Sequence, residues 1–284
     1  MRVDGSFPPN PAEKPGYVLG FHDDFSGPEL DPGKWFPYYL PQWSSRAQAA
    51  ARYRLTGHSL ELLIEQDQEP WCPEFDGHIR VSSLQTGCFA GPLGSRVGQH
   101  RSKENVVVRE AQDDLRLYTP TYGFFETRLR AVPVPGYMVA LWMIGVERRP
   151  EHSGEICICE LFGHEMTDKA ATVGYGVHPF GDPGLTDAFF RDELELDASA
   201  FHVYAAEWTP DRVDFHVDNR KLRTVTQAIA YPMQFMLNIY ELPGQLAATS
   251  EGAAWPKVFE VDYVRGYRPL EGYEAGASGG PCIS

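Results

Sequence analysis

Cysteine is scarce in this sequence, and its distribution excludes a small domain held together by disulfides. The five cysteines of the 284 residues are Cys72, Cys88, Cys157, Cys159 and Cys282. An odd number leaves at least one thiol unpaired, and the irregular spacing does not match a disulfide framework. A Cys72–Cys88 disulfide is the one pairing that we consider, and only for an oxidising compartment.

Basic residues are also few. Lys and Arg total 25 against 39 Asp and Glu, so the formal net charge is −14. A polyphosphate would be repelled by this charge, and we therefore expect no nucleic-acid partner. A neutral, polyhydroxylated ligand is compatible with it. The 6 Trp, 14 Tyr and 16 Phe offer flat apolar faces for stacking on such a ligand, although aromatic side chains fill β-sandwich cores equally well.

Long hydrophobic runs are missing. No stretch of about 18 consecutive apolar residues occurs, so we expect no membrane span. Residues 1–17 lack the apolar centre of a secretory signal and contain prolines at positions 8, 9, 11 and 15, which predict an extended segment. The expected location is cytoplasmic by default, or extracellular if a signal has been removed. We expect a monomer.

Amphipathic helical periodicity is nearly absent, whereas short stretches rich in β-branched and aromatic residues recur between turn signals. This pattern predicts an all-β fold, a sandwich of two antiparallel sheets or a jelly roll, with one domain at 18–269 and a flexible tail at 270–284. Asp218-Asn219 lies inside a predicted hairpin over 213–225. The predicted strands cover 60–65, 106–109, 124–131, 138–145, 155–161, 171–178, 201–208, 212–217, 234–239 and 258–267.

One of these strands contains closely spaced acids, in "GEICICELFGHE" at 154–165. Strict alternation places Glu155 and Cys157 on one face of the strand and Glu160 on the other. A β-bulge of one residue just after Cys157 would bring Glu160 to the face of Glu155. Two carboxylates about 5 to 5.5 Å apart are the requirement of a retaining glycosidase. Spacing alone is equally compatible with two glutamates on an exposed strand face.

Further motifs accompany this stretch in a fixed order. They are "GFHDDFSGPELDPGKW" (20–35), "YGFFETRLRAVPVPGYMVALWMIG" (122–145), "FHVYAAEWTPDRVDFHVDNRKL" (201–222), "PMQFMLNIY" (232–240) and "FEVDYVRGYRP" (259–269). Together with 154–165, they make the chain resemble glycoside hydrolase family 16, in the branch with the bulged signature E-[ILV]-D-x-x-E, such as laminarinases and agarases. The resemblance covers about Leu19 to Pro269. It implies a concanavalin-like β-jelly roll with a sugar-binding cleft.

The resemblance also implies roles for individual residues. Glu155 corresponds to the catalytic nucleophile, and Glu160 to the general acid/base. Trp142 corresponds to a tryptophan of the cleft, and His178 to a histidine near the catalytic subsites. Each of these two has an alternative, since Trp142 is also suited to the sandwich core and His178 to the end of a strand. Tyr240 is suited either to stacking on a sugar or to sealing the sandwich.

Cys157 departs from the family pattern, because it stands where the signature has Asp. The resemblance implies that this middle carboxyl hydrogen-bonds the nucleophile and tunes its charge. A thiol is a weak donor and a poor acceptor. By analogy with a lost oxyanion-hole donor, the exchange is expected to lower the rate on the order of 10- to 1000-fold.

The function that follows is a retaining endo-glycoside hydrolase acting on a β-linked polysaccharide: a β-1,3- or mixed-linkage glucan, or a galactan. A noncatalytic carbohydrate-binding protein on the same fold and a transglycosylase are the alternatives. The chemistry requires no cofactor. The resemblance implies a structural calcium ion held by Asp262 with the carbonyl of Gly57, while a plain salt bridge from Asp262 is equally compatible. The Gly-rich segment 85–101 either borders the cleft or is a surface loop without function.

Overall fold

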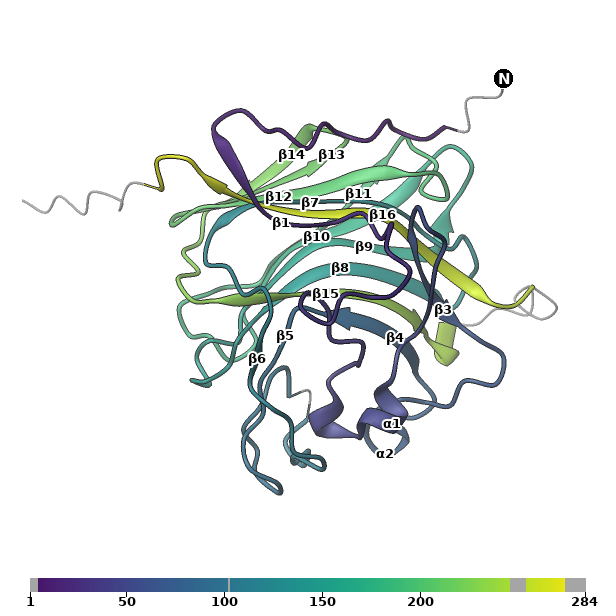
Figure 1. Ribbon diagram of the computed structural model, residues 1–284, viewed down its shortest axis with the longest axis vertical. Helices are drawn as coiled ribbons and strands as arrows, with labels where there is room; N and C mark the ends of the chain where they lie inside the picture. The colour runs from purple at the N-terminus through teal and green to yellow at the C-terminus, as the bar shows by residue number, and fades with distance from the viewer. Residues whose placement is uncertain (1–4, 102, 246–253, 274–284) are drawn as a thin grey trace, which may run out of the picture.

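Two antiparallel β-sheets packed face to face form the body of the protein (Figure 1). The structure is a computed structural model, which describes residues 5–101, 103–245 and 254–273. The all-β prediction is confirmed, as is the arrangement in two antiparallel sheets, because every pairing between the described strands is antiparallel.

The larger sheet has the strand order β14-β13-β12-β7-β16-β3-β2, with β1 also pairing to β16. Its strands are β1 (Tyr17–Asp23), β2 (Arg52–Leu55), β3 (Leu60–Ile64), β7 (Gly123–Arg130), β12 (His202–Trp208), β13 (Val213–Val217), β14 (Arg220–Val225) and β16 (Lys257–Pro269).

The smaller sheet has the order β11-β10-β9-β8-β15-β4 and carries the candidate site. Its strands are β4 (Arg80–Gln85), β8 (Tyr137–Gly145), β9 (Glu155–Met166), β10 (Ala171–His178), β11 (Ala188–Leu194) and β15 (Met233–Glu241). A separate pair is formed by β5 (Gly87–Cys88) and β6 (Leu115–Arg116).

The main core lies between the two sheets and is built by the alternation of apolar side chains along the strands. Phe125 of β7 and Phe235 of β15 meet edge to face across the layers, with ring centroids 5.2 Å apart. Ile156 and Leu161 of β9 are buried in the same cluster. Fully burying one such side chain contributes about 1.5–3 kcal/mol.

The hairpin predicted over 213–225 is confirmed. Strands β13 and β14 pair in it, and the two turn residues Asp218 and Asn219 have φ values of 51° and 62°. Positive φ at both central positions is characteristic of the type I′ turn, whose twist matches that of the flanking strands.

One predicted strand is wrong. Residues 106–109 form no strand, whereas the other predicted stretches overlap strands of the structure. Val106 and Val108 are buried by loop packing instead, and the backbone N–H of Val108 donates to the carbonyl of Ser95. An alternating apolar pattern in a loop that covers a sheet face therefore resembled a strand.

A second apolar cluster covers part of the outer face of the smaller sheet, the face turned away from the larger sheet. We call the covering residues the cap. They come from the connections β1–β2, β3–β4 and β5–β6. These connections include η1 (Pro41–Trp43), α1 (Arg46–Ala49) and α2 (Pro73–Asp76). Figure 1 shows α1 and α2 near β4. The cap residues are Tyr39, Leu40, Trp43, Trp71, Cys72, Val106 and Val108.

No described helix is long and apolar enough to cross a membrane.

The cysteines of the described residues are free thiols. Cys72 lies under the cap and Cys88 in β5, and both are buried without a disulfide between them. The Cys72–Cys88 pairing considered above is therefore wrong for this structure. Cys282 lies outside the described residues.

The N-terminal segment is attached to the larger sheet by hydrogen bonds. The N-terminal segment runs along the larger sheet in extended form, where Phe7 N–H donates to the carbonyl of Phe201 at 2.7 Å and Asn10 Nδ2 donates to Glu126 Oε2 at 3.1 Å. Residues 1–4, and the predicted tail from 274 onward, lie outside the described residues.

Candidate active site

A β-bulge in β9 brings the two candidate acids onto one face, as the sequence predicts. In the pairing with β8, Cys157 lies opposite Trp142 and Cys159 lies opposite Leu141, so Ile158 is the extra residue of β9. On the other side, the pairing with β10 shifts over the same positions. Ile158 and Cys159 both turn into the core between the sheets.

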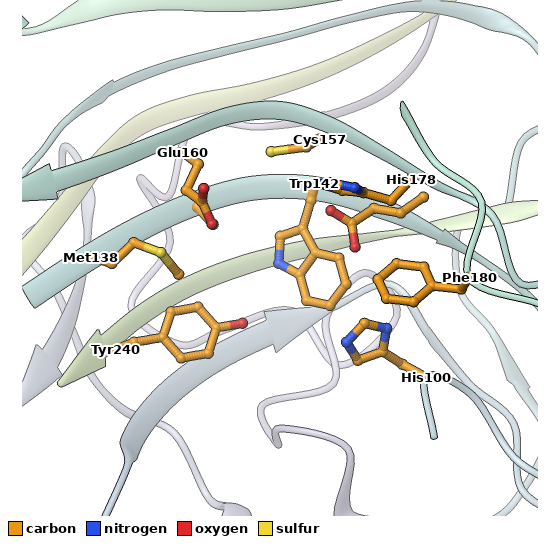
Figure 2. Close-up of a pocket in the computed structure, with 10 residues that line it drawn as sticks. His100, Met138, Trp142, Cys157, Glu160, His178, Phe180 and Tyr240 are labelled. Atoms are coloured by element: carbon orange, nitrogen blue, oxygen red, sulfur yellow. The ribbon is translucent and has the colours of Figure 1, made fainter. Parts of the chain in front are cut away.

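The consequence is a pocket on the outer face of the smaller sheet that is lined by Glu155, Cys157 and Glu160. Figure 2 shows Cys157 and Glu160 at this pocket. Its volume is about 230 Å³. Glu155 is only 8% exposed, so the alternative of two glutamates on a solvated strand face does not apply. The pocket is lined by His100, Met138, Ala140, Trp142, Glu155, Cys157, Glu160, His178, Phe180 and Tyr240.

Glycines on β10 leave the space that the acids occupy. Gly174 pairs with Glu160, and a Cβ at Gly174 would lie 3.3 Å from the Cβ of Glu160 and 2.7 Å from Phe189. Gly176 pairs with Cys157 and has a φ of 149°, where a Cβ would approach the carbonyl of Ala188 to 2.2 Å. A larger residue at Gly176 would therefore push β11 away from the site.

Burial makes the acids of this pocket hard to ionise. Burial, with a smaller contribution from the nearby charge of Glu160, raises the pKa of Glu155 to about 8. The pKa of Glu160 is also raised by burial, while Arg191 and His178 act in the opposite direction. The pair therefore retains a proton at neutral pH, as general acid catalysis requires.

Cys157 is held as a neutral thiol. Burial raises its pKa well above the ordinary range, and the charges of Glu155 and Glu160 raise it further. Since the thiolate is the nucleophilic form of cysteine, attack by Cys157 itself is disfavoured. Its S–H can act only as a weak donor to the acids beside it.

Trp142 lies in the pocket rather than in the core between the sheets. Its indole Nε1 donates to Asn238 Oδ1 at 2.6 Å, which fixes the ring against the outer face of the sheet. Tyr240 also faces the pocket and reaches the cap through its hydroxyl, 3.4 Å from that of Tyr39. Tyr240 therefore lines the pocket and packs against the cap on the outer face, and it does not seal the sandwich between the two sheets.

His178 does more than end a strand. It pairs with Glu155 across β10 and β9 and lines the pocket. Its Nδ1 lies 2.6 Å from Asp187 Oδ1, and its ring stacks on Phe189 with centroids 4.7 Å apart. These two contacts fix the orientation of the imidazole beside the acids.

Sequence reasoning left out Met138, Phe180 and His100 as site residues. His100 arrives from the Gly-rich segment 85–101, so this segment does border the pocket. Its ring packs edge to face on Trp142 and Phe180, with centroids 5.1 Å and 4.9 Å away. Burial lowers the pKa of His100 to about 4, so the ring is neutral at physiological pH. The polar tip of the segment was visible in the sequence, but its partner was not.

The predicted calcium donors lie away from the pocket. Asp262 Oδ2 accepts from Arg128 Nη1 at 2.7 Å, on the larger sheet, and Gly57 is in the turn between β2 and β3. A guanidinium in contact with the carboxylate is unfavourable for a divalent cation, so the donors in this arrangement do not fit calcium. Within the described ranges, no group of three or more His, Cys, Asp or Glu is able to hold a metal. The calcium ion remains a prediction of the resemblance.

Comparison with known proteins identifies relatives of this arrangement. Residues 118–265 match the family model described as Glycosyl hydrolases family 16. Among solved structures, a GlcNAcα1-4Gal-releasing endo-β-galactosidase from Clostridium perfringens superposes with a TM-score of 0.82 at 32% identity, covering 95% of this chain and 66% of that chain. The laminarinase catalytic domain of Thermotoga maritima superposes with a TM-score of 0.62 at 18% identity, covering 89% of this chain and 99% of that chain, and supports the fold alone.

Curated relatives are longer proteins. The endo-1,3-1,4-β-glycanase ExsH of Rhizobium meliloti is 23% identical over 53% of this chain and 31% of its own length. The glucan endo-1,3-β-glucosidase A1 of Niallia circulans is 24% identical over 89% of this chain and 38% of its own length. The chain thus spans 31% and 38% of the length of these two relatives.

Proposed function

Because the chain belongs to glycosyl hydrolase family 16, we propose that it is a retaining, endo-acting hydrolase of a β-linked polysaccharide. The main support for this proposal is the bulge at Ile158, because it places the side chains of Glu155 and Glu160 in the same pocket. The fold alone would not suffice, since one fold hosts many functions.

The mechanism needs opposite protonation states at the two acids. Ionised Glu155 attacks the anomeric carbon while Glu160 donates its proton to the departing glycosidic oxygen, and a covalent glycosyl–enzyme ester forms. Glu160, now ionised, then takes a proton from water as that water attacks the anomeric carbon and releases Glu155. The apolar walls of the pocket, including Trp142 and Phe180, would pack on the sugar rings.

The residue at position 157 affects which of the two acids, Glu155 or Glu160, is ionised. The reaction requires ionised Glu155 and protonated Glu160, whereas burial raises the pKa of both acids in the free enzyme. The two acids titrate as a coupled pair, so the rate depends on how the shared proton is divided between them. A strong donor at position 157 would favour ionised Glu155, and a thiol is a weak one. We propose that the enzyme is slow for this reason.

The relatives suggest where to look for the substrate. The endo-β-galactosidase shares 32% identity over 95% of this chain, whereas the laminarinase domain shares 18%. We therefore place β-galactosides before β-glucans as the proposed substrate. The direct test is incubation with galactans, agarose, laminarin and lichenan, followed by assay for new reducing ends. Binding without any new reducing ends would favour the noncatalytic alternative.

Products are expected to keep the β configuration. Two successive displacements at the anomeric carbon restore the original stereochemistry. Proton NMR of the first minutes of reaction should show the β-anomeric signal of the new reducing end before mutarotation adds the α signal. The α signal appearing first would contradict the role of Glu155 as nucleophile.

The pH dependence of kcat/KM is expected to be bell-shaped, with its alkaline limb near pH 8. Above the pKa of about 8 at Glu155, the coupled pair loses its last proton and no acid remains for the leaving oxygen. Initial rates at subsaturating substrate between pH 4 and pH 10 would measure this limb. Activity that stays level through pH 9 would contradict a shared proton on this pair.

A further inference from the structure

A second pocket adjoins the candidate active site. Its volume is about 470 Å³, and it shares two walls with the first pocket, His100 and Phe180. Figure 2 shows these two rings beside each other at one edge of the site. Phe180 is 56% exposed with a φ of 44°, so an aromatic face lies open where the two pockets meet. A glycan bound over Glu155 and Glu160 would therefore have the second pocket next to it, on the side of His100 and Phe180.

The charge of this second pocket is opposite to that of the protein. The whole chain carries −14, yet three arginines line the pocket, Arg96, Arg101 and Arg148. We call it the arginine pocket.

The guanidinium groups of the arginine pocket are not all neutralised. The residues that the structure describes offer Arg96 no hydrogen bond and no ion pair. Arg101 Nη1 donates to the backbone carbonyl of Glu104 at 3.1 Å, and its charge acts on the carboxyl of Glu147, whose pKa it lowers. Arg148 contacts the carboxylate of Asp114 and is compensated. Within the described part of the chain, Arg96 thus remains free for a ligand, and the charge of Arg101 is compensated only in part.

The acid among the lining residues, Glu147, does not cancel these charges. One of its oxygens accepts the backbone N–H of His100 at 2.5 Å, so it serves to hold the 85–101 segment over the site. Burial also raises the pKa of Glu147 to about 7, and its charge is therefore incomplete at neutral pH. The pocket keeps a positive balance.

We propose that the arginine pocket binds an anionic substituent, a sulfate ester or a carboxylate, on a sugar of the substrate next to the cleaved bond. Guanidinium groups present paired N–H donors that match the oxygens of both groups. A neutral polysaccharide offers no partner for Arg96 and Arg101. The inference rests on the proposed function only in the identity of the ligand as a glycan, since the charge and the geometry are independent of catalysis.

Binding to matched polymers tests this inference without requiring cleavage. The 284-residue chain with Glu160→Gln would be run in native gels containing κ-carrageenan or its chemically desulfated form, and polygalacturonate or its methyl ester. We expect retardation at about fivefold lower concentration of the anionic polymer in at least one pair. The pair that responds distinguishes sulfate from carboxylate. Added salt at about 0.3 M should weaken the preference, because it screens exposed charges.

Matched variants assign the effect to the pocket. Arg96→Ala/Arg101→Ala should remove the preference, whereas Arg220→Ala, an exposed arginine of β14 on the other sheet, should retain it. Equal retardation by charged and neutral polymers in both pairs would overturn the inference, as would an equal loss in Arg220→Ala. Cleavage of neutral glycans without a charge preference would leave the proposed function standing and remove only the inference. Selective retardation with no cleavage by the unaltered chain would do the reverse.

Discussion

Replacing Glu155 by glutamine is expected to lower kcat/KM by at least about a thousandfold, because the amide cannot form the glycosyl ester. The same variant should be more stable than the unaltered chain at high pH. The pKa of Glu155 is raised to about 8 in the folded protein, so the stability that its neutral form provides is lost as pH rises through that value. Glutamine stays neutral throughout.

Two measurements on Glu155→Gln separate catalysis from folding. Reducing-end assays give the rate, and thermal unfolding at pH 5 and pH 9 gives the stability. We expect equal melting temperatures at pH 5 and a gain of at least about 2 °C at pH 9, which corresponds to about 1 kcal/mol for a chain of this size. Glu13→Gln, an exposed acid of the N-terminal segment, should change neither quantity. Substantial activity in Glu155→Gln would contradict the proposed nucleophile.

Replacing Cys157 by aspartate is expected to raise kcat/KM about 10- to 100-fold near neutral pH. The new carboxyl would stay protonated between the charges of Glu155 and Glu160 and would donate a strong O–H hydrogen bond to Glu155. Each unit by which the pKa of Glu155 falls relative to that of Glu160 multiplies the productive protonation form about tenfold. Cys157 lines the pocket of about 230 Å³, into which the carboxyl would point.

Two substitutions at the same position are the controls for this gain. Cys157→Asn has nearly the shape of aspartate but no acidic proton, and should show no comparable gain. Cys157→Ser introduces a better donor than the thiol and should fall between cysteine and aspartate. Steady-state rates and melting temperatures of all three variants are needed. If a folded Cys157→Asp is no faster than the unaltered chain, the thiol does not limit the rate.

The strands that form the smaller sheet were predictable because side-chain alternation depends only on residues that are close in sequence. Along β9, burial of Ile156, Ile158 and Leu161 together with exposure of two acids to one pocket is possible only if the alternation breaks once. The break is visible in the sequence, because Ile156 and Ile158 are two positions apart whereas Ile158 and Leu161 are three positions apart. Strands β8 and β10 were predictable from their alternation, whereas the positions of Trp142 and His178 beside the acids were implied by the resemblance.

The rim of the site was not predictable because its contacts join distant residues without any periodic pattern. Gln99 Nε2 donates to Gln234 Oε1 at 2.7 Å, across 135 positions of sequence, and this bond helps to carry His100 to Trp142. The cap was not predictable for the same reason. Residues 106–109 have the pattern of a strand, but Val106 and Val108 are buried by packing over the sheet.

The sequence by itself determined the two-sheet fold through side-chain alternation, and it placed the two acids on one face only with the β-bulge predicted after Cys157. Only the tertiary structure decided what surrounds them. The joining of His100 and Phe180, and the arginine pocket behind them, depend on where loops of no fixed repeat come to rest on the sheet.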